Sequence, residues 1–323
     1  AYASLGQYQK AINYSQQALE IARKIDYPSG ESNALNSLGI AYASQGQYKE
    51  AIVYSRQALD IAREIGNRSM EGTYLGNLGN AYNFLGESQK AIRYYEQALE
   101  IAREIGDRAG EGSGLGNLGS VYDSLGQYET AIDYHQQCLE IERSIGDRAG
   151  EGRSLCNLGN AYHYQGEYQQ AINYYQQALV ILQEIGHCEF QANTLFGLGN
   201  AYNHLVEYQQ AIESHQQCLE IERSIGERGR AASSLCSLGL IYESLGQFQK
   251  AIELQQQALE LRKQVGDRSG EGGSLCNLGN AYASLGQYQQ AIEFYQQALV
   301  VLREANHLEF LANTLNGMGS AYK

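Results

Sequence analysis

The sequence has little of several residue types that would indicate other classes of protein. Its 323 residues contain one proline and no tryptophan, and 36 acidic residues outnumber 23 basic ones, which gives a net charge of −13. An acidic surface cannot neutralise a phosphate backbone or anionic lipid, so we expect neither nucleic acid nor a membrane among the partners. No apolar run approaches the roughly 20 residues of a membrane span. The abundance of Gln, Ala, Leu and Glu favours helix over a mixed α/β composition.

Sequence patterns of catalysis and of metal or disulfide chemistry are missing too. No GxSxG, HExxH, P-loop or Cys-His nucleophile pattern occurs, so we expect the chain not to be an enzyme and to bind no cofactor. The cysteines form no CxxC pair, and the chain is too large to need disulfides; reduced thiols in a cytoplasmic protein are the simplest interpretation. The cysteines are Cys138, Cys156, Cys188, Cys218, Cys236 and Cys276.

What the sequence does contain is one unit repeated every 40 residues. A tyrosine recurs at positions 2, 42, 82, 122, 162, 202, 242, 282 and 322, and a constant glycine at 39, 79, 119, 159, 199, 239, 279 and 319. Within residues 107–146, apolar or small residues recur at helical spacing first from Leu115 to Leu125 and then from Ala131 to Ile145. The repeat therefore predicts an all-α fold of about eight antiparallel helix pairs.

The breaks between these helices are equally regular. LGQY or a relative, as at Gly126, Gly166 and Gly286, predicts a left-handed glycine at the end of the first helix of a unit, and IGDR or a relative, as at Gly106, Gly146 and Gly266, predicts one at the end of the second helix. Asp107, which follows Gly106, is expected to cap the next helix. Val206 replaces the first kind of glycine and should strain its turn.

The constant residues resemble the tetratricopeptide repeat. That repeat carries the spacing seen at Leu275, Leu278-Gly279, Tyr282, Ala291, Tyr295 and Ala298, and the match covers residues 1–323, which we expect to form a single array. The unit is longer than the usual one of roughly 34 residues. This longer form is similar to the repeats of the Pins and LGN class of polarity adaptors, of kinesin light chains and of bacterial signalling proteins. The resemblance implies a right-handed α-solenoid whose first helices line a concave groove.

The resemblance also places a set of polar, variable positions in that groove. An asparagine side chain offers both a donor and an acceptor, so a ladder of them can pair with the backbone of an extended peptide. The alternative is that these amides cap turns or hydrogen-bond within their own repeat. The candidate groove residues are Asn77, Asn80, Asn117, Asp123, Arg153, Asn157, Asn160, His163, Tyr164, Asn200, Asn203, His204, Glu243, Asn277 and Asn280.

The charges in this set bear on the ligand. The carboxylate clamp of chaperone-binding members needs Lys or Arg beside the asparagines, but only Arg153 is such a residue here. A free C-terminal carboxylate is therefore a poor candidate. Asp123 and Glu243 instead favour a protein or peptide partner that bears basic residues.

Two HQQCLE segments raise the question of a metal site. They place His135 with Cys138, and His215 with Cys218, on one helical face. Tyr95 with Ala98 occupies the same places in another unit, so we interpret His and Cys as packing residues. His163 and His204 fall in adjacent units without a further matched ligand, and we expect no metal there.

The stretch GLGNLG, residues 114–119, matches the GxGxxG pattern of dinucleotide-binding sites. That site needs a preceding strand, whereas Gly119 is the constant glycine inside a helix and the other two glycines vary between units. We interpret the match as coincidence. The many glycines of this first helix predict the weakest and most flexible helix of the array.

Two units replace GDRxGEG by sequences with Phe190 and Phe310 where glycine usually stands. Either phenylalanine packs the start of its helix, or it is an apolar contact point for a partner.

These features together predict a scaffold that binds an extended or helical peptide. The alternative is a sensory or regulatory arm of a multidomain bacterial enzyme whose catalytic domain lies outside this sequence. Residues 2–4 look like the tail of a first helix, and no polar capping helix occurs at either end. We therefore expect a segment of a longer protein, with self-association through its open ends.

Overall fold

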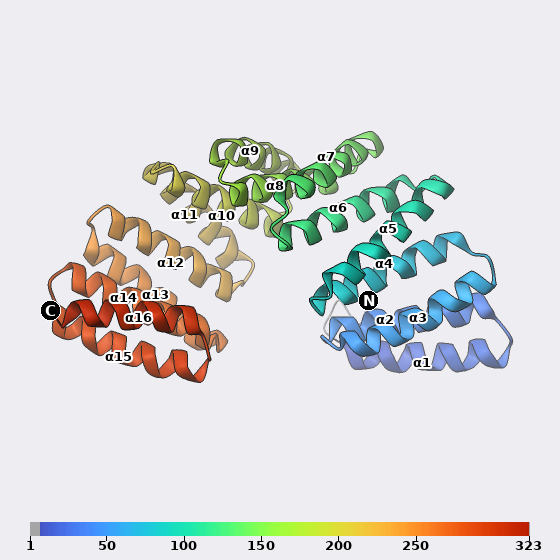
Figure 1. Cartoon of the computed structure of the whole chain (residues 1–323), viewed down its shortest axis with the longest axis horizontal. Helices are drawn as coiled ribbons and strands as arrows, with labels where there is room; N and C mark the ends of the chain where they lie inside the picture. Colours follow the sequence, from blue (N-terminus) through green and yellow to red (C-terminus); the bar gives the residue numbers. More distant parts are fainter. Residues whose placement is uncertain (1–6, 323) are drawn as a thin grey trace. The chain divides into compact units, whose positions relative to one another are not determined.

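The computed structural model describes residues 7–322, so the predicted helix tail at residues 2–4 lies outside it. The described residues fold into sixteen helices joined by short turns, with no strand among them, which confirms the all-α fold and fits about eight helix pairs (Figure 1). The helices are α1 (Tyr8–Lys24), α2 (Pro28–Ser44), α3 (Tyr48–Glu64), α4 (Arg68–Phe84), α5 (Ser88–Ile105), α6 (Arg108–Ser124), α7 (Tyr128–Ile145), α8 (Arg148–Gln165), α9 (Tyr168–Glu184), α10 (Cys188–His204), α11 (Tyr208–Ser224), α12 (Arg228–Ser244), α13 (Phe248–Val265), α14 (Arg268–Ser284), α15 (Tyr288–Glu304) and α16 (Leu308–Ala321).

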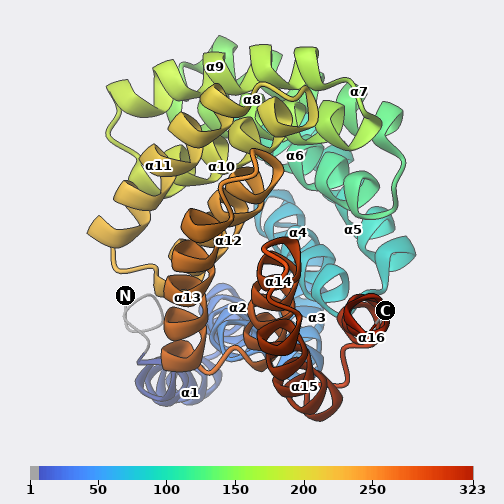
Figure 2. The same ribbon diagram turned by 90° about the vertical axis from the view of Figure 1, so that its left-hand side faces the viewer.

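The helices belong to two compact units, one ending at residue 165 and the other starting at residue 166. In the first unit, α2, α4, α6 and α8 are the first helices of their repeats; each contacts the next, and α3, α5 and α7 form a second layer against them. In the second unit, α10, α12, α14 and α16 are the first helices, and Figure 2 shows α14, α15 and α16 packed together. Both units thus have two layers of helices.

The constant glycine lets the two helices of a pair approach closely. An added Cβ at Gly79 of α4 would lie 2.5 Å from Cε1 of Tyr95 on α5, and Tyr95 is only 2% exposed. An added Cβ at Gly119 of α6 would lie equally close to Cε1 of His135 on α7. The glycine therefore makes room for the large side chain opposite it.

The turn and cap predictions are confirmed. Gly126 has φ 70° and Gly106 has φ 72°, both in the left-handed region. The side chain of Asp107 accepts a hydrogen bond of 2.9 Å from the backbone N–H of Gly110, at the start of α6. The same segment gives the pattern GDRxGEG a second role, because the buried carboxylate of Glu111 pairs with Arg103 at 2.9 Å and also with Arg108.

The GLGNLG segment lies wholly inside α6, and α5, which precedes α6, is a helix as well. The strand that a dinucleotide site requires is therefore missing from this place, as the repeat alignment indicated. The flexibility of α6 stays a prediction.

Phe190 and Phe310 are both partly buried at the starts of their helices. The backbone N–H of Phe310 donates to Nδ1 of His307, the N-cap of α16, and the phenylalanine packs against the core of the second unit. For Phe310, packing at the helix start is thus the confirmed interpretation. The backbone N–H of Phe190 donates in the same way to Nδ1 of His187, the N-cap of α10. The ring centroids of Phe190 and His187 are 4.8 Å apart.

Val206 confirms the strain expected in the turn after α10. Its φ is 64°, a conformation that a β-branched residue adopts at a cost, and its side chain is 63% exposed and so gains little from packing.

Val206→Gly is expected to stabilise the second unit by about 1 kcal/mol. Urea unfolding monitored by circular dichroism measures this change. Val206→Ala, which keeps a Cβ at positive φ, is the control and should recover less; equal or lower stability of the glycine variant would contradict the strain.

Candidate functional site

The first helices of the first unit border a row of three hollows. One of about 440 Å³ lies between α2 and α4, a second of about 270 Å³ between α4 and α6, and a third of about 230 Å³ between α6 and α8. Side chains of α3, α5 and α7 contribute to them in turn. We call the surface of α2, α4, α6 and α8 that lines these hollows the first-helix face.

Several candidate groove residues lie on this face. Asn77 and Asn80 border the first and second hollows, Asn117 borders the second and third, and Arg153 and Asn157 border the third. Asp123, on α6, and Asn160, His163 and Tyr164, on α8, belong to the same helices but do not line the hollows. The remaining candidates lie on first helices of the second unit: Asn200, Asn203 and His204 on α10, Glu243 on α12, and Asn277 and Asn280 on α14.

Some of the asparagines form hydrogen bonds within the protein, two of them within their own repeat, as the alternative interpretation held, and two between repeats. The hydroxyl of Tyr95 donates to Oδ1 of Asn80 at 2.7 Å, and the hydroxyl of Tyr295 donates in the same way to Asn280 at 2.8 Å. Between repeats, Nδ2 of Asn77 donates to Oδ1 of Asn36 at 2.8 Å. Nδ2 of Asn277 donates to the sulfur of Cys236 at 3.2 Å. Each of these bonds uses one end of the amide and leaves the complementary group for a second bond.

The two acidic candidates have intramolecular roles. Oδ2 of Asp123 lies 2.9 Å from Nε2 of the buried His135, so this carboxylate holds the histidine of the neighbouring helix. Glu243 accepts from the hydroxyl of Ser284 at 3.5 Å, and burial raises its pKa above the usual value. Glu243 is therefore a poorer anchor for a basic ligand than its sequence position suggested, whereas Oδ1 of Asp123 is buried without a hydrogen-bond partner among residues 7–322.

A carboxylate that the sequence analysis passed over lies in the floor of the third hollow. Glu142 of α7 lines it together with Asp147, Arg153, Ser154 and Asn157. Burial raises the pKa of the Glu142 carboxyl, while Ser154, Cys138 and Arg153 act in the opposite direction. Comparison of the repeats marks Glu142 as unusual, because the same position holds alanine in two earlier units, at Ala62 and Ala102.

The HQQCLE segments serve packing, as predicted from the tyrosine and alanine at the same places. The thiol of Cys138 donates to the carbonyl of Gly112 at 3.1 Å, and burial raises the pKa of this thiol to about 12. Cys218 bonds in the same way to the carbonyl of Ala192. Over residues 7–322 no group of three His, Cys, Asp or Glu side chains has the arrangement of a metal site.

Aromatic candidates at the ends of the first helices stack on neighbouring repeats. Tyr164 of α8 stacks on Tyr128 of α7 with ring centroids 5.8 Å apart, and His204 of α10 stacks on Tyr168 of α9 at 4.5 Å. Tyr164 nevertheless remains 66% exposed. His163 meets Tyr164 edge to face at 5.6 Å. These rings join successive helices, and Tyr164 also offers an open face to solvent.

A family model described as tetratricopeptide repeat matches residues 1–64, 30–104, 69–144, 111–184 and 190–264. Further models of the same description match residues 156–217 and 274–303. The chain belongs to the tetratricopeptide repeat family. Repeats of this family typically form non-catalytic scaffolds for interactions, which makes this tetratricopeptide array an interaction or regulatory domain. No curated protein sequence shows significant similarity to the chain.

Solved structures share the fold of the array at low sequence identity. A signal transduction ATPase with numerous domains from Pyrococcus horikoshii, which has a tetratricopeptide repeat sensor, matches with 20% identity and a TM-score of 0.74; the alignment covers 96% of this chain and 50% of that one. The apo form of the quorum sensor NprR from B. thuringiensis matches with 19% identity and a TM-score of 0.71, covering 93% and 85%. The apo form of RapI matches with 17% identity and a TM-score of 0.68, covering 85% and 99%. In the described part of the array, no helix is long and apolar enough to span a membrane.

Proposed function

We propose that this tetratricopeptide array is a scaffold that binds an extended peptide of a partner protein along the first-helix face. The observation that carries the proposal is the row of three hollows, bordered in turn by Asn77, Asn117 and Asn157 at one and the same position of the repeat. A row of equivalent sites at a regular spacing suits a ligand that is itself a chain.

The chemistry of the amides supports an extended peptide. Asn77 donates to Asn36 and keeps its carbonyl oxygen as an acceptor, whereas Asn80 accepts from Tyr95 and keeps its two N–H donors. Backbone N–H and C=O groups of a peptide need both kinds of partner. The intramolecular bonds also hold the amides in place before the ligand arrives, which lowers the entropic cost of binding.

A second candidate function is the sensory arm of a longer signalling protein. The similarity to the Pyrococcus horikoshii ATPase favours it, because the array covers half of a chain in which tetratricopeptide repeats are a sensor. The two candidates are compatible, since a sensor also needs a ligand on its groove. A catalytic domain encoded beside this sequence would favour the arm.

The test replaces the three equivalent asparagines together. The variant carries Asn77→Ser, Asn117→Ser and Asn157→Ser. Two other units already have serine at this position of the repeat, at Ser37 and Ser237, so the fold should tolerate the change. Peptides selected from a displayed random library on the wild-type protein are the probes, and calorimetry measures their affinity. Three lost hydrogen bonds of about 0.5–1.5 kcal/mol each predict binding weakened at least tenfold.

The matched control lies on the other layer of helices. Gln17→Ser, Gln57→Ser and Gln97→Ser change three exposed residues at one repeat position of α1, α3 and α5, and affinity should stay unchanged. If the asparagine variant keeps full helicity and full affinity, or if both variants lose affinity equally, the first-helix face is not the binding surface.

A further inference from the structure

The floor of the third hollow holds a carboxylate with an unused oxygen. Glu142 is only 6% exposed, it lines the hollow, and its Oε2 is buried without a hydrogen-bond partner among residues 7–322. A buried carboxylate oxygen in this condition costs free energy unless a donor reaches it. At the same place α3 and α5 carry Ala62 and Ala102, so the fold does not need this carboxylate.

A second carboxylate converges on the same point. An added Cβ at Gly150 of α8 would lie 2.6 Å from Oε1 of Glu142 and 2.5 Å from Oδ2 of Asp147. The other oxygen of Asp147, Oδ1, accepts from the backbone N–H of Gly150. Two negatively charged groups thus meet above a residue that has no side chain of its own.

The second unit has a related arrangement at the equivalent place. Glu222 and Glu227 occupy the places of Glu142 and Asp147, but Arg230 stands where the first unit has Gly150. Burial raises the pKa of Glu222, and Ser234 and the charge of Arg230 act in the opposite direction. Ser234 also donates to Oε2 of Glu222 at 2.8 Å, so the oxygen that is unused in Glu142 is satisfied here. A guanidinium of the chain acts on the glutamate by its charge at both places, from Arg230 at Glu222 and from the exposed Arg153 at Glu142, but only Glu222 has its Oε2 satisfied by a hydrogen bond.

We propose that the hollow between α6 and α8 receives an arginine side chain of the bound partner, with Glu142 and Asp147 as its anionic anchors. This inference rests on the proposed function, because it fixes the chemistry of one position in a peptide that runs along the first-helix face. A guanidinium carries five N–H donors in a planar fork and bonds two carboxylates at once, which a lysine ammonium does less well. The predicted preference for a basic ligand is thereby extended to Glu142 and Asp147.

Arg153 on the rim is the internal competitor. It lines the hollow and its side chain is exposed, and its charge lowers the pKa of Glu142 against the effect of burial. An incoming arginine takes over this electrostatic role, and the exposed side chain of Arg153 turns towards solvent. The site therefore has an anionic floor that becomes available when Arg153 moves outward.

The test uses a probe that contains no peptide chain. Nα-acetyl-arginine methylamide is titrated into the wild-type protein at pH 8, because burial raises the pKa of Glu142 and an alkaline pH favours its ionised form, and the amide resonances of Gly112 and Gly150 are followed by NMR. We expect saturable shifts in the millimolar range. The citrulline analogue, which is neutral and has nearly the same shape, should bind at least tenfold more weakly, since it lacks the charge that the carboxylates recognise.

Two variants and one control locate the site. Glu142→Ala introduces the alanine that two other units have at this position, at Ala62 and Ala102. Gly150→Arg introduces the arginine that the second unit has at the equivalent position, Arg230. Each variant should bind the arginine compound at least tenfold more weakly. Glu222→Ala is the control at the equivalent place and should leave binding unchanged. The proposal would be overturned if the shifts did not saturate, if the citrulline analogue bound as tightly as the arginine compound, or if the Glu142→Ala variant bound the arginine compound as tightly as the wild-type protein. Peptide selection and the titration with the arginine compound are separate measurements. If peptides are selected but the arginine compound does not bind, only this inference is refuted. If the arginine compound binds but no peptide is selected, only the peptide scaffold is refuted.

Discussion

Alanine at Gly79 and alanine at Gly76 are expected to change the stability of the first unit in opposite directions. Both glycines lie in α4, three residues apart. An added Cβ at Gly79 would lie 2.5 Å from Cε1 and 2.6 Å from Cδ1 of Tyr95, whereas an added Cβ at Gly76 meets nothing within 4 Å. Helix propensity favours alanine at both places by about 1 kcal/mol, so the difference between the variants measures the contact with Tyr95.

Tyr95 has little freedom to move away. Its side chain is 2% exposed and its hydroxyl donates to Asn80, so a shift of the ring opens a cavity in the core or breaks that bond. Overpacking of this kind costs about 1–3 kcal/mol. We expect Gly79→Ala to destabilise α4 and α5 by about 2 kcal/mol and Gly76→Ala to stabilise them by about 1 kcal/mol.

Hydrogen exchange of the α4 and α5 amides measures both effects locally, which suits a repeat array in which helices unfold in parts. Gly76→Ala serves as the control for helix propensity. If the two variants protect the amides to the same degree, the constant glycine is not there to admit Tyr95.

The sequence predicts most of the fold because its signals are local and repeated. The turn glycine at 126, the cap at Asp107 and the helical spacing within residues 107–146 all involve residues a few places apart, and the repeat shows them many times. The structure confirms each of them, and the family models and solved structures confirm the repeat itself.

The site was less predictable because its contacts join residues of different helices. Asp123 meets His135 across the turn between α6 and α7, and Tyr95 reaches Asn80, which is fifteen residues earlier in the chain. Comparison of the repeats shows which positions vary, but it does not show which polar atoms are already satisfied. Glu142 was missed for this reason: it replaces an alanine on a second helix, and only the packed structure brings it under the face formed by the first helices.

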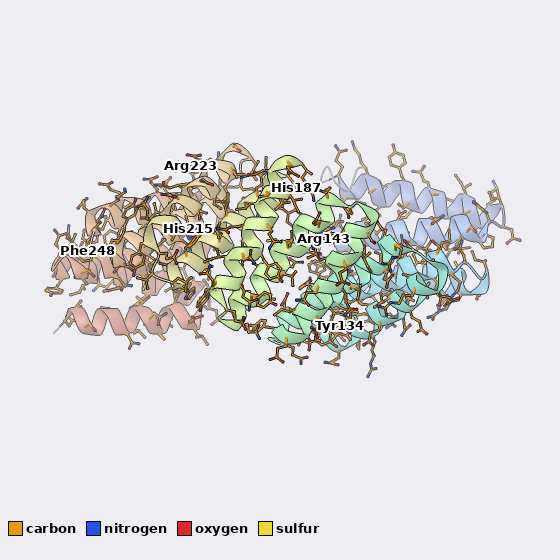
Figure 3. All side chains as sticks on the ribbon, turned by 90° about the horizontal axis from the view of Figure 1, so that it is seen from above. Tyr134, Arg143, His187, His215, Arg223 and Phe248 are labelled. Atoms are coloured by element: carbon orange, nitrogen blue, oxygen red, sulfur yellow. The ribbon has the colours of Figure 1, made fainter. Side chains whose placement is uncertain are left out.

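His215 is expected to give a strong dependence of stability on pH between neutral and acidic conditions. It lies on α11 (Figure 3). Its side chain is 0% exposed, and neither ring nitrogen has a hydrogen-bond partner within the described part of the chain. Burial lowers the pKa of His215 from 6.5 to about 4. The ring of Phe196 meets that of His215 edge to face, with centroids 5.3 Å apart, and is an apolar neighbour that offers no hydrogen-bond acceptor. The folded state therefore holds this histidine neutral.

The direction of the pH effect follows from that shift. Since the folded pKa lies below the unfolded one, the unfolded state binds the proton first as pH falls. The stabilisation is complete above pH 6.5 and is lost as the pH falls from 6.5 towards 4, by on the order of 3 kcal/mol in total. Between pH 7.5 and pH 5 the loss is about 2 kcal/mol.

His215→Gln isolates this contribution. Gln255 occupies the equivalent place on α13 and donates to the carbonyl of Cys236 at 3.1 Å, so glutamine fits this position of the repeat and does not titrate. Hydrogen exchange of α11 at pH 7.5 and pH 5 should show the wild-type protein losing about 2 kcal/mol more than the variant over this interval. All other titratable groups are common to the two proteins, so their effects cancel in the difference. Parallel losses in the two proteins would mean that His215 is already protonated, or already has a partner, in the folded state.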